Sequence, residues 1–339
     1  MPTWGEILAE INGTAELLQS TGRGNLSPHD IVRRKYLNVA TTTTGRPTIL
    51  YASAWLTNYS APPGLMSVAD EDVHGFMEAV HGLAGTTLDL ILHSPGGSAS
   101  GAEAIVKYLR TKFDDIRIIV PHMAMSAATM IACAANQILM GKHSFLGPID
   151  PQFIMQTGLG VRSVPAVAIL EQFERALQDA ADPAKLRVWA PMLSQYGPDL
   201  LVTCQNAMKL SEGLVSEWLQ SYMFARHVDA ESRAKQVAAW LSDHTLFKTH
   251  ARPIARDELR AKGLEIQDLE QNQAEQDAFL SVYHATAHTF SGTPSVKIIE
   301  NNLGKAFMKM SLAGQQIQFA PTPPGAIPPA APTPANAAP

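Results

Sequence analysis

The stretch that most constrains this chain is an apolar run that ends in a glycine turn and continues as a helix, at residues 87–110. TLDLILH is a strand pattern, SPGG is a tight turn, and SASGAEAIVKYLR has helical spacing. A strand, a glycine turn and a helix N-terminus together favour an anion, because free N–H groups lie at such a turn. The anion is either a bound phosphate or a charge that develops during a reaction.

Similar patterns surround this unit. Residues 48–55 and 116–120 have strand patterns, residues 70–84 place several apolar side chains on one helical face, and residues 126–141 favour a helix that leads to a further strand. Apolar strands that alternate with helices are typical of an α/β fold with a parallel sheet covered on both faces.

The remaining segments divide the chain. Residues 1–45 are predicted to form an N-terminal helical segment, and residues 46–270 the α/β domain, with a helical insertion at about 164–241. Residues 271–318 are predicted to form a helical C-terminal arm. Residues 319–339 are rich in proline and alanine, a composition that cannot bury a core.

Composition excludes several classes of protein. Of the 339 residues, 46% are hydrophobic and 17% charged, which is typical of a globular chain, and the net charge of -5 without long runs of one sign does not indicate nucleic-acid binding. The N-terminus lacks the basic start of a signal peptide, and polar residues interrupt the apolar stretch at 117–140. We therefore expect a soluble, cytoplasmic protein without a membrane span.

The glycine turn does not match a phosphate-binding motif. A P-loop needs lysine and then serine or threonine after its last glycine, but alanine and glutamate follow Gly101. A dinucleotide-binding turn needs glycine at its third position, but Gly96 and Gly97 are followed by Ser98. A reaction-linked charge is therefore the better hypothesis.

A second turn places Ser126 between the strand pattern of residues 116–120 and a helix of small residues. Such a serine is most often an ordinary N-cap. If the two turns lie on adjacent parallel strands, however, the N–H groups of the glycine turn face the serine hydroxyl. That arrangement is an oxyanion hole beside a nucleophile, suited to the tetrahedral intermediate of acyl transfer.

HSPGG (93–97) and AMSAATMIACAANQILMGKHSFLGPIDPQ (124–152) together resemble the serine dehydrogenase proteinase family, within the Clp-peptidase and crotonase superfamily and related to signal-peptide peptidases. The resemblance covers about residues 47–155, with a weaker match at residues 242–266. It implies a Clp/crotonase-like parallel sheet flanked by helices, with a mainly helical C-terminal arm. It also implies a serine peptidase that cleaves a peptide or protein substrate and assembles as a homo-oligomer.

The resemblance also implies the roles of the site residues. A serine nucleophile needs a base, and Clp peptidases place a histidine where this chain has Ile149 and Asp150. The order serine, aspartate, histidine assigns Ser126 as nucleophile, Asp150 as orienting carboxylate and His250, in KTHARPI, as base. The oxyanion hole is expected at Gly96 and the N–H groups of Gly97 and Ala127.

Alternative assignments stay open at this point. His143 is a second candidate base, and Lys185 or Lys209 would serve a Ser–Lys dyad like that of signal-peptide peptidases. His93 and His122 flank the two turns, either as pocket residues or as ordinary buried histidines. Asp150 could be only a turn residue before proline.

Two other functions are compatible with the same turns. One is a catalytically silent scaffold that binds a peptide or a partner protein. The other is a crotonase-like acyl-CoA enzyme, which would need a basic site for the CoA phosphates, and no clear cluster of lysine or arginine is present. No metal or organic cofactor is expected, because no cysteine or histidine cluster has ligand spacing.

Overall fold

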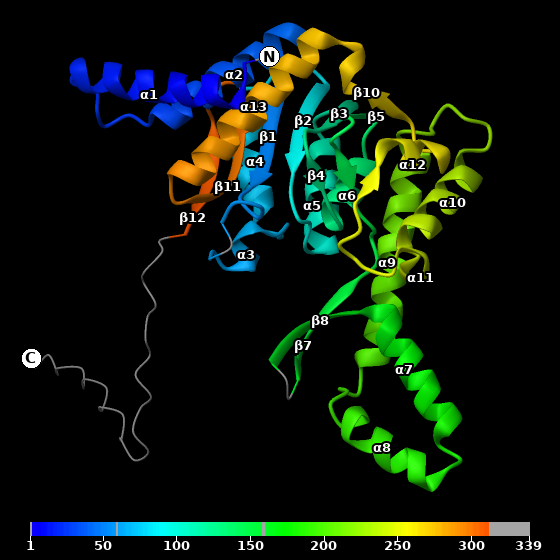
Figure 1. The fold of residues 1–339 in the computed structure, drawn as a ribbon. Coiled ribbons are helices and arrows are strands. Elements are labelled where there is room, and N and C mark those ends of the chain that lie inside the picture. Colours follow the sequence, from blue (N-terminus) through cyan, green and yellow to red (C-terminus); the bar gives the residue numbers. More distant parts are fainter. Residues whose placement is uncertain (1, 59, 158–159, 312–339) are drawn as a thin grey trace, which may run out of the picture.

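A seven-stranded sheet forms the centre of the computed structural model, which describes residues 2–58, 60–157 and 160–311 (Figure 1). Its strand order is β10-β5-β3-β2-β1-β11-β12. The first five are mutually parallel, β11 is antiparallel to β1, and β12 is antiparallel to β11. The strands are β1 (Thr48–Ser53), β2 (Thr87–His93), β3 (Asp115–Val120), β5 (Gln137–Met140), β10 (Ile266–Asp268), β11 (Ser295–Asn301) and β12 (Ala306–Met310).

Helices cover both faces of this sheet (Figure 1). On one face lie α2 (Pro28–Thr44) and α13 (Gln273–Gly292), with α1 (Trp4–Ser20) packed against them. On the other face lie α4 (Asp72–Val80), α5 (Ala99–Arg110), α6 (Ala127–Cys133), α9 (Leu200–Ser221) and α10 (Ala230–Ser242). The short helices are α3 (Pro63–Met66), α11 (His244–Phe247), α12 (Arg256–Ala261) and η1 (Leu269–Gln271).

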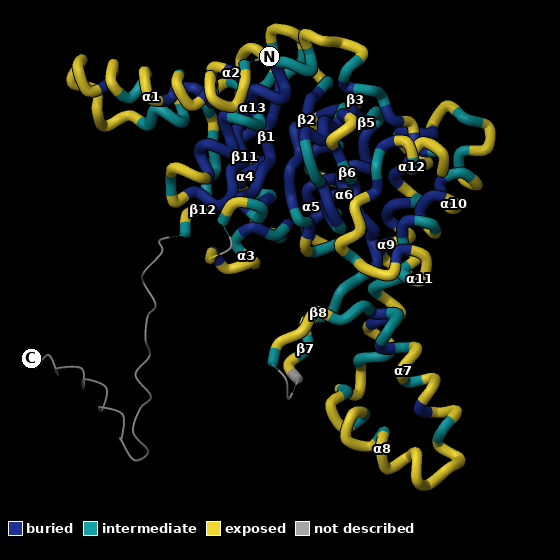
Figure 2. Tube along the Cα trace, in the orientation of Figure 1, coloured by how far each residue is buried: buried dark blue, intermediate teal, exposed yellow. Residues whose placement is uncertain are grey.

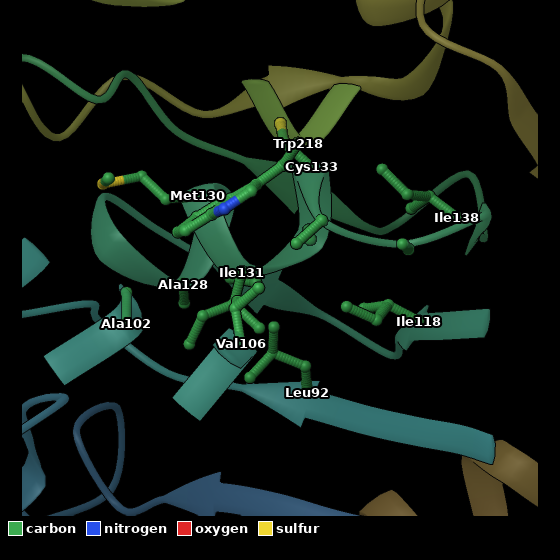
Figure 3. Packing of buried hydrophobic residues seen from close by; sticks show 14 of the residues in the cluster. Leu92, Ala102, Val106, Ile118, Ala128, Met130, Ile131, Cys133, Ile138 and Trp218 are labelled. Carbon is green, nitrogen blue, oxygen red and sulfur yellow. The ribbon is translucent and has the colours of Figure 1, made fainter. Parts of the chain in front are cut away.

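The two faces of the sheet carry two separate apolar clusters. In β2, Leu90 and Leu92 pack on the face of α5 and α6, and Ile91 packs on the face of α13. All three are fully buried, and each such side chain contributes about 1.5–3 kcal/mol of burial free energy. Figure 3 shows how Leu92 meets Val106 of α5 and Ile131 of α6. The predicted α/β class with a mostly parallel sheet is therefore confirmed.

A small second sheet gathers three segments that are far apart in the sequence. It consists of β4 (Met123–Ala124), β6 (Phe145–Leu146) and β9 (Ile254–Ala255). β6 lies in the middle, parallel to β4 and antiparallel to β9. This sheet positions the candidate active site described below.

One part of the chain projects from the core (Figures 1 and 2). We call residues 152–199 the arm; it contains the hairpin of β7 (Gln152–Thr157) and β8 (Gly160–Pro165), then α7 (Ala166–Asp179) and α8 (Pro183–Leu193). Its buried cluster is small and joins Ala166 and Ile169 of α7 to Cys204 of α9. α9 leads back to the core. Within the described residues, no helix is both long and apolar enough to span a bilayer.

Two sequence-based expectations need correction. The helix expected at residues 126–141 ends at Cys133, and residues 137–140 form β5, because this apolar run pairs with β3 at the centre of the sheet. The helical arm expected at 271–318 is a helix only in α13, and β11 and β12 then extend the sheet. Residues 312–339, including the Pro/Ala tail, lie outside the described residues.

The β11 strand was not predicted from the sequence because charged residues interrupt its apolar pattern. Its sequence SVKIIEN is buried along its whole length, yet it contains Lys297 and Glu300. Each is fully buried and paired with an opposite charge, Lys297 with Asp72 and Glu300 with Arg33. Because the charges are neutralised in pairs, the strand lies in the core without an apolar signature.

Candidate active site

Ser126 lies at a sharp turn between β4 and α6. Its backbone has φ 53° and ψ -121°, a left-handed conformation that costs a non-glycine residue about 1–3 kcal/mol. Its side chain makes no capping hydrogen bond to α6, so Ser126 is not an ordinary N-cap. Strain of this kind persists only where the surrounding structure enforces it, and it is typical of functional turns.

The glycine turn lies directly against Ser126. Gly96 has φ +87°, and a Cβ there would lie 2.3 Å from the Met125 carbonyl oxygen, 2.6 Å from Ser126 Cβ and 2.7 Å from the Ala127 nitrogen. Two backbone hydrogen bonds connect the turns, from Ser94 N–H to the Met123 carbonyl and from Met125 N–H to the Ser94 carbonyl. Only glycine fits at position 96, and the two turns are adjacent.

Hydrogen bonds on the far edge of the glycine turn fix the direction of its N–H groups. Val68 N–H donates to the Gly96 carbonyl at 2.8 Å, and Ser98 N–H donates to the Val68 carbonyl at 2.9 Å. Val68 and Gly97 form a parallel bridge, in which the N–H group of Gly97 points away from Val68. In the described part of the chain, neither Gly97 N–H nor Ala127 N–H has a hydrogen-bond acceptor.

Asp150 is a buried carboxylate that binds two histidines. Its Oδ1 lies 2.7 Å from His250 Nδ1, and its Oδ2 lies 2.8 Å from His244 Nδ1. Gln152 Nε2 donates a further hydrogen bond to Oδ2 at 2.8 Å. Asp150 is only 3% exposed, so these donors compensate a charge that has lost its water. It is therefore more than a turn residue before proline.

The small sheet explains why these residues meet. Ser126 follows β4, Asp150 follows β6, and His250 precedes β9. Because β6 is parallel to β4 and antiparallel to β9, all three residues leave the sheet at the same end. In the described residues, however, the Ser126 hydroxyl makes no hydrogen bond to either ring, and such contacts often close only when substrate binds.

His244 is the site residue that the sequence-based assignment missed. It is the first residue of α11, whereas His250 lies beyond that helix. Lys248 between them has φ +65° and turns the chain so that both rings reach one carboxylate. The signal was present, since both histidines belong to the segment 242–266, but spacing alone does not show that two rings share one aspartate.

The alternative bases lie elsewhere. His143 precedes β6, at the end opposite Asp150, and its ring contacts Gly141. Lys185 is exposed on α8 and pairs with Asp179, and Lys209 is exposed on α9. Neither lysine has the buried setting on which a Ser–Lys dyad depends.

His93 is buried and His122 is half-buried. Their rings stack with centroids 5.8 Å apart, and Tyr283 of α13 lies 3.1 Å from His122 Nδ1. Burial lowers the pKa of His93 to about 3 and also lowers the pKa of His122, so both rings are neutral near pH 7. No group of three or more potential ligands in the described residues is arranged to hold a metal ion.

Comparison with known proteins adds the family. The family described as ClpP-like SDH-type serine proteinase matches residues 70–288. Two uncharacterized proteins of Methanocaldococcus jannaschii, MJ1495 and MJ0137, are 30% and 32% identical to this chain over 179 residues, which is 53% of this chain and 51% and 53% of those proteins. The chain thus spans about half the length of the curated relatives it matches.

Proposed function

Because the chain belongs to the ClpP-like SDH-type serine proteinase family, we propose that it is a serine peptidase that cleaves peptide bonds through an acyl-enzyme on Ser126. The observation that carries this proposal is the contact of Gly96 with Ser126 and the Ala127 nitrogen, beside which the N–H groups of Gly97 and Ala127 have no acceptor in the described residues. We propose that these two free donors bind the oxyanion that develops during attack by the serine hydroxyl.

The proposed reaction has two halves. Ser126 Oγ attacks the carbonyl carbon of the substrate, its proton passes to a histidine Nε2, and the carbonyl oxygen becomes an oxyanion that Gly97 and Ala127 bind. The histidine then gives the proton to the leaving amine as the C–N bond breaks, which leaves an ester on Ser126. Water, deprotonated by the same histidine, hydrolyses the ester and restores the hydroxyl.

We assign the base to His250, with Asp150 orienting its ring. A carboxylate at Nδ1 fixes the tautomer that leaves Nε2 free to accept a proton. His250 is connected directly to β9, which pairs with the strand that leads to Asp150. His244 then acts as a second donor that holds the other carboxylate oxygen.

A fluorophosphonate probe tests the proposal, because it reacts only with an activated serine. The Ser126→Ala variant is expected to lose all labelling and keep its fold. Ser98→Ala is the matched control, since Ser98 adjoins the same glycine turn but its hydroxyl caps α5 and bonds to Ser100. A wild-type protein that resists labelling would favour the peptide-binding scaffold, and labelling that persists in Ser126→Ala would exclude Ser126 as nucleophile.

We also propose a homo-oligomer that assembles through the arm. Large apolar side chains are exposed along it, including Ile154, Leu177, Val188 and Met192. Its small buried cluster gives the arm little core of its own, so contact with another copy would bury this surface. Sedimentation of the protein and of a Val188→Glu/Leu177→Glu variant tests this, because two charges on the surface are expected to yield monomers.

A further inference from the structure

The segment Ser67–Ala69 lies behind the glycine turn and sets its orientation. Val68 binds the turn through both its backbone groups, to the Gly96 carbonyl and to Ser98 N–H. A Cβ on Gly97 would lie 2.4 Å from the Val68 carbonyl oxygen, so the two backbones are in direct contact. Any shift of Val68 therefore moves the peptide that carries Gly97 N–H.

A fully buried ion pair holds both neighbours of Val68. Lys297 Nζ lies 2.8 Å from both carboxylate oxygens of Asp72, and it also donates to the Ser67 carbonyl at 2.6 Å. Asp72 Oδ2 accepts from Ala69 N–H at 3.0 Å. The side chains of Lys297 and Asp72 are both 0% exposed.

A third residue completes the arrangement. Tyr51 donates its hydroxyl to Asp72 Oδ2 at 2.7 Å. Burial, together with the Asp72 carboxylate, raises the pKa of Tyr51 well above its ordinary value, so this hydroxyl remains a donor. The network continues to Lys309, which lies 3.6 Å from Asp72 and is only 9% exposed, and ends at its exposed partner Glu71.

Rigid elements hold these side chains in place. Tyr51 is on β1, Lys297 is on β11, and Asp72 is the first residue of α4. α4 lies close to β11 because Gly75 has no side chain: a Cβ there would be 2.5 Å from Ile299 Cδ1. On the other side, α5 approaches the segment at Gly101, where a Cβ would be 2.8 Å from the Ala69 carbonyl carbon.

We propose that Lys297, Asp72 and Tyr51 form a clamp on Ser67–Ala69 that aims Gly97 N–H at the oxyanion, so that they are positioning residues for the reaction of Ser126. This inference rests on the proposed function of Ser126. Two apolar side chains could fill the same space and often serve folding as well as a buried ion pair does. They could not hold the Ser67 carbonyl and Ala69 N–H, which the two charges bind directly.

That difference provides the test. The Lys297→Met/Asp72→Leu variant removes both charges and both backbone contacts while it leaves no unpaired charge. The control is Arg33→Met/Glu300→Leu, a second buried ion pair whose acidic member is on the same strand; its removal leaves the partly exposed Arg34 and Asp30 without these partners. The full-length proteins are labelled with a fluorophosphonate at a series of probe concentrations. In a second set of proteins, Ser126→Cys is added to the unaltered chain, to the clamp variant and to the control. Mass spectrometry then measures the rate at which iodoacetamide alkylates position 126. This reaction needs no oxyanion hole, so it reports only whether position 126 is accessible and correctly placed.

We expect the limiting labelling rate of the clamp variant to fall about tenfold to a hundredfold, the usual effect of a small misplacement at a reacting group. The half-saturating probe concentration and the alkylation rate of the clamp variant are expected to stay within about twofold of those of the unaltered protein. The limiting labelling rate of the control variant is expected to stay within the same range. Unchanged labelling in the clamp variant would refute the clamp, and so would an equal fall in alkylation or in the control.

Two further outcomes are also decisive. If the double variant does not fold, Tyr51→Phe takes its place: it removes one hydrogen bond to Asp72 and is expected to lower the limiting labelling rate about fivefold, roughly the effect of a mean hydrogen bond. Labelling of Tyr51→Phe at the unaltered rate would refute the clamp. If the unaltered protein is not labelled at all, the proposed function fails, and the clamp fails with it.

Discussion

Gly96→Ala is the substitution for which the structure gives the most definite expectation. The added methyl group would lie 2.3 Å from one backbone oxygen and 2.7 Å from the Ala127 nitrogen, and neither backbone can yield without moving Ser126. The residue also has φ +87°, which an alanine adopts at a cost of about 1–2 kcal/mol. Overpacking adds about 1–3 kcal/mol. We expect the variant to lose about 2–5 kcal/mol of unfolding free energy if the turn stays in place.

The turn can instead move to accommodate the methyl group of Gly96→Ala. In that case the variant loses activity rather than unfolding free energy. A displacement that takes Gly97 N–H away from the oxyanion removes one donor, which lowers the rate about 10²–10³-fold. The added methyl group therefore lowers the labelling rate, the free energy of unfolding, or both, and at least one of them must fall measurably. The assay is fluorophosphonate labelling of Ser126 beside urea unfolding of the same sample.

Gly85→Ala is a control that separates the cost of a positive φ from the cost of steric contact with neighbouring atoms. Gly85 has φ +84°, nearly that of Gly96, but a Cβ there meets no atom within 4 Å. This control is expected to lose only the conformational cost, about 1–2 kcal/mol, and to label at the unaltered rate. If Gly96→Ala behaves like Gly85→Ala in both assays, the glycine turn does not lie against the reacting serine and the proposed oxyanion hole is wrong.

Two further predictions concern histidines. His250→Ala is expected to lower the labelling rate of Ser126 about 10²–10⁴-fold, as removal of a general base does. His244→Ala is expected to lower the same rate about tenfold or less, the effect of one lost hydrogen bond on Asp150. The reverse order of the two rates would assign the base to His244. The second concerns stability: the pKa of His93 is about 3 in the folded protein, below its value of about 6.5 when unfolded, so the unfolded chain binds the extra proton between these values. Stability should therefore fall as the pH drops below about 6.5, by about 2 kcal/mol at pH 5. Urea unfolding should show this loss reduced in His93→Gln and retained in a His81→Gln control at an exposed site; equal losses in both variants would contradict it.

Local patterns were sufficient to predict the centre of the fold. β2, the glycine turn and α5 form one continuous unit, and the runs that became β1 and β3 are apolar because their strands are buried on both faces. The error at residues 126–141 arose where small apolar residues of α6 continue into β5. Periodicity over so short a run does not distinguish a buried helix from a buried strand.

The candidate site was only partly predictable, for a different reason. Ser126 was predicted from its combination with the glycine turn and the family motif, whereas the partners of Asp150 are distant in sequence and meet it through the small sheet. His244 and His250 look equivalent in sequence, and only their shared carboxylate shows that both belong to the site. Val68 has no sequence signal at all, because it acts through its backbone.

Thr129 also connects the segments around Ser126. The Thr129 hydroxyl donates to the Ala124 carbonyl at 2.8 Å and accepts from Gly147 N–H at 2.9 Å. One buried hydroxyl thus connects the strand before Ser126 to the segment that leads to Asp150. Strands of two residues hold few hydrogen bonds of their own, so the register of the small sheet relies on such side-chain contacts. The strained backbone of Ser126 is kept in place because contacts from three directions oppose its relaxation: the glycine turn, the small sheet and α6.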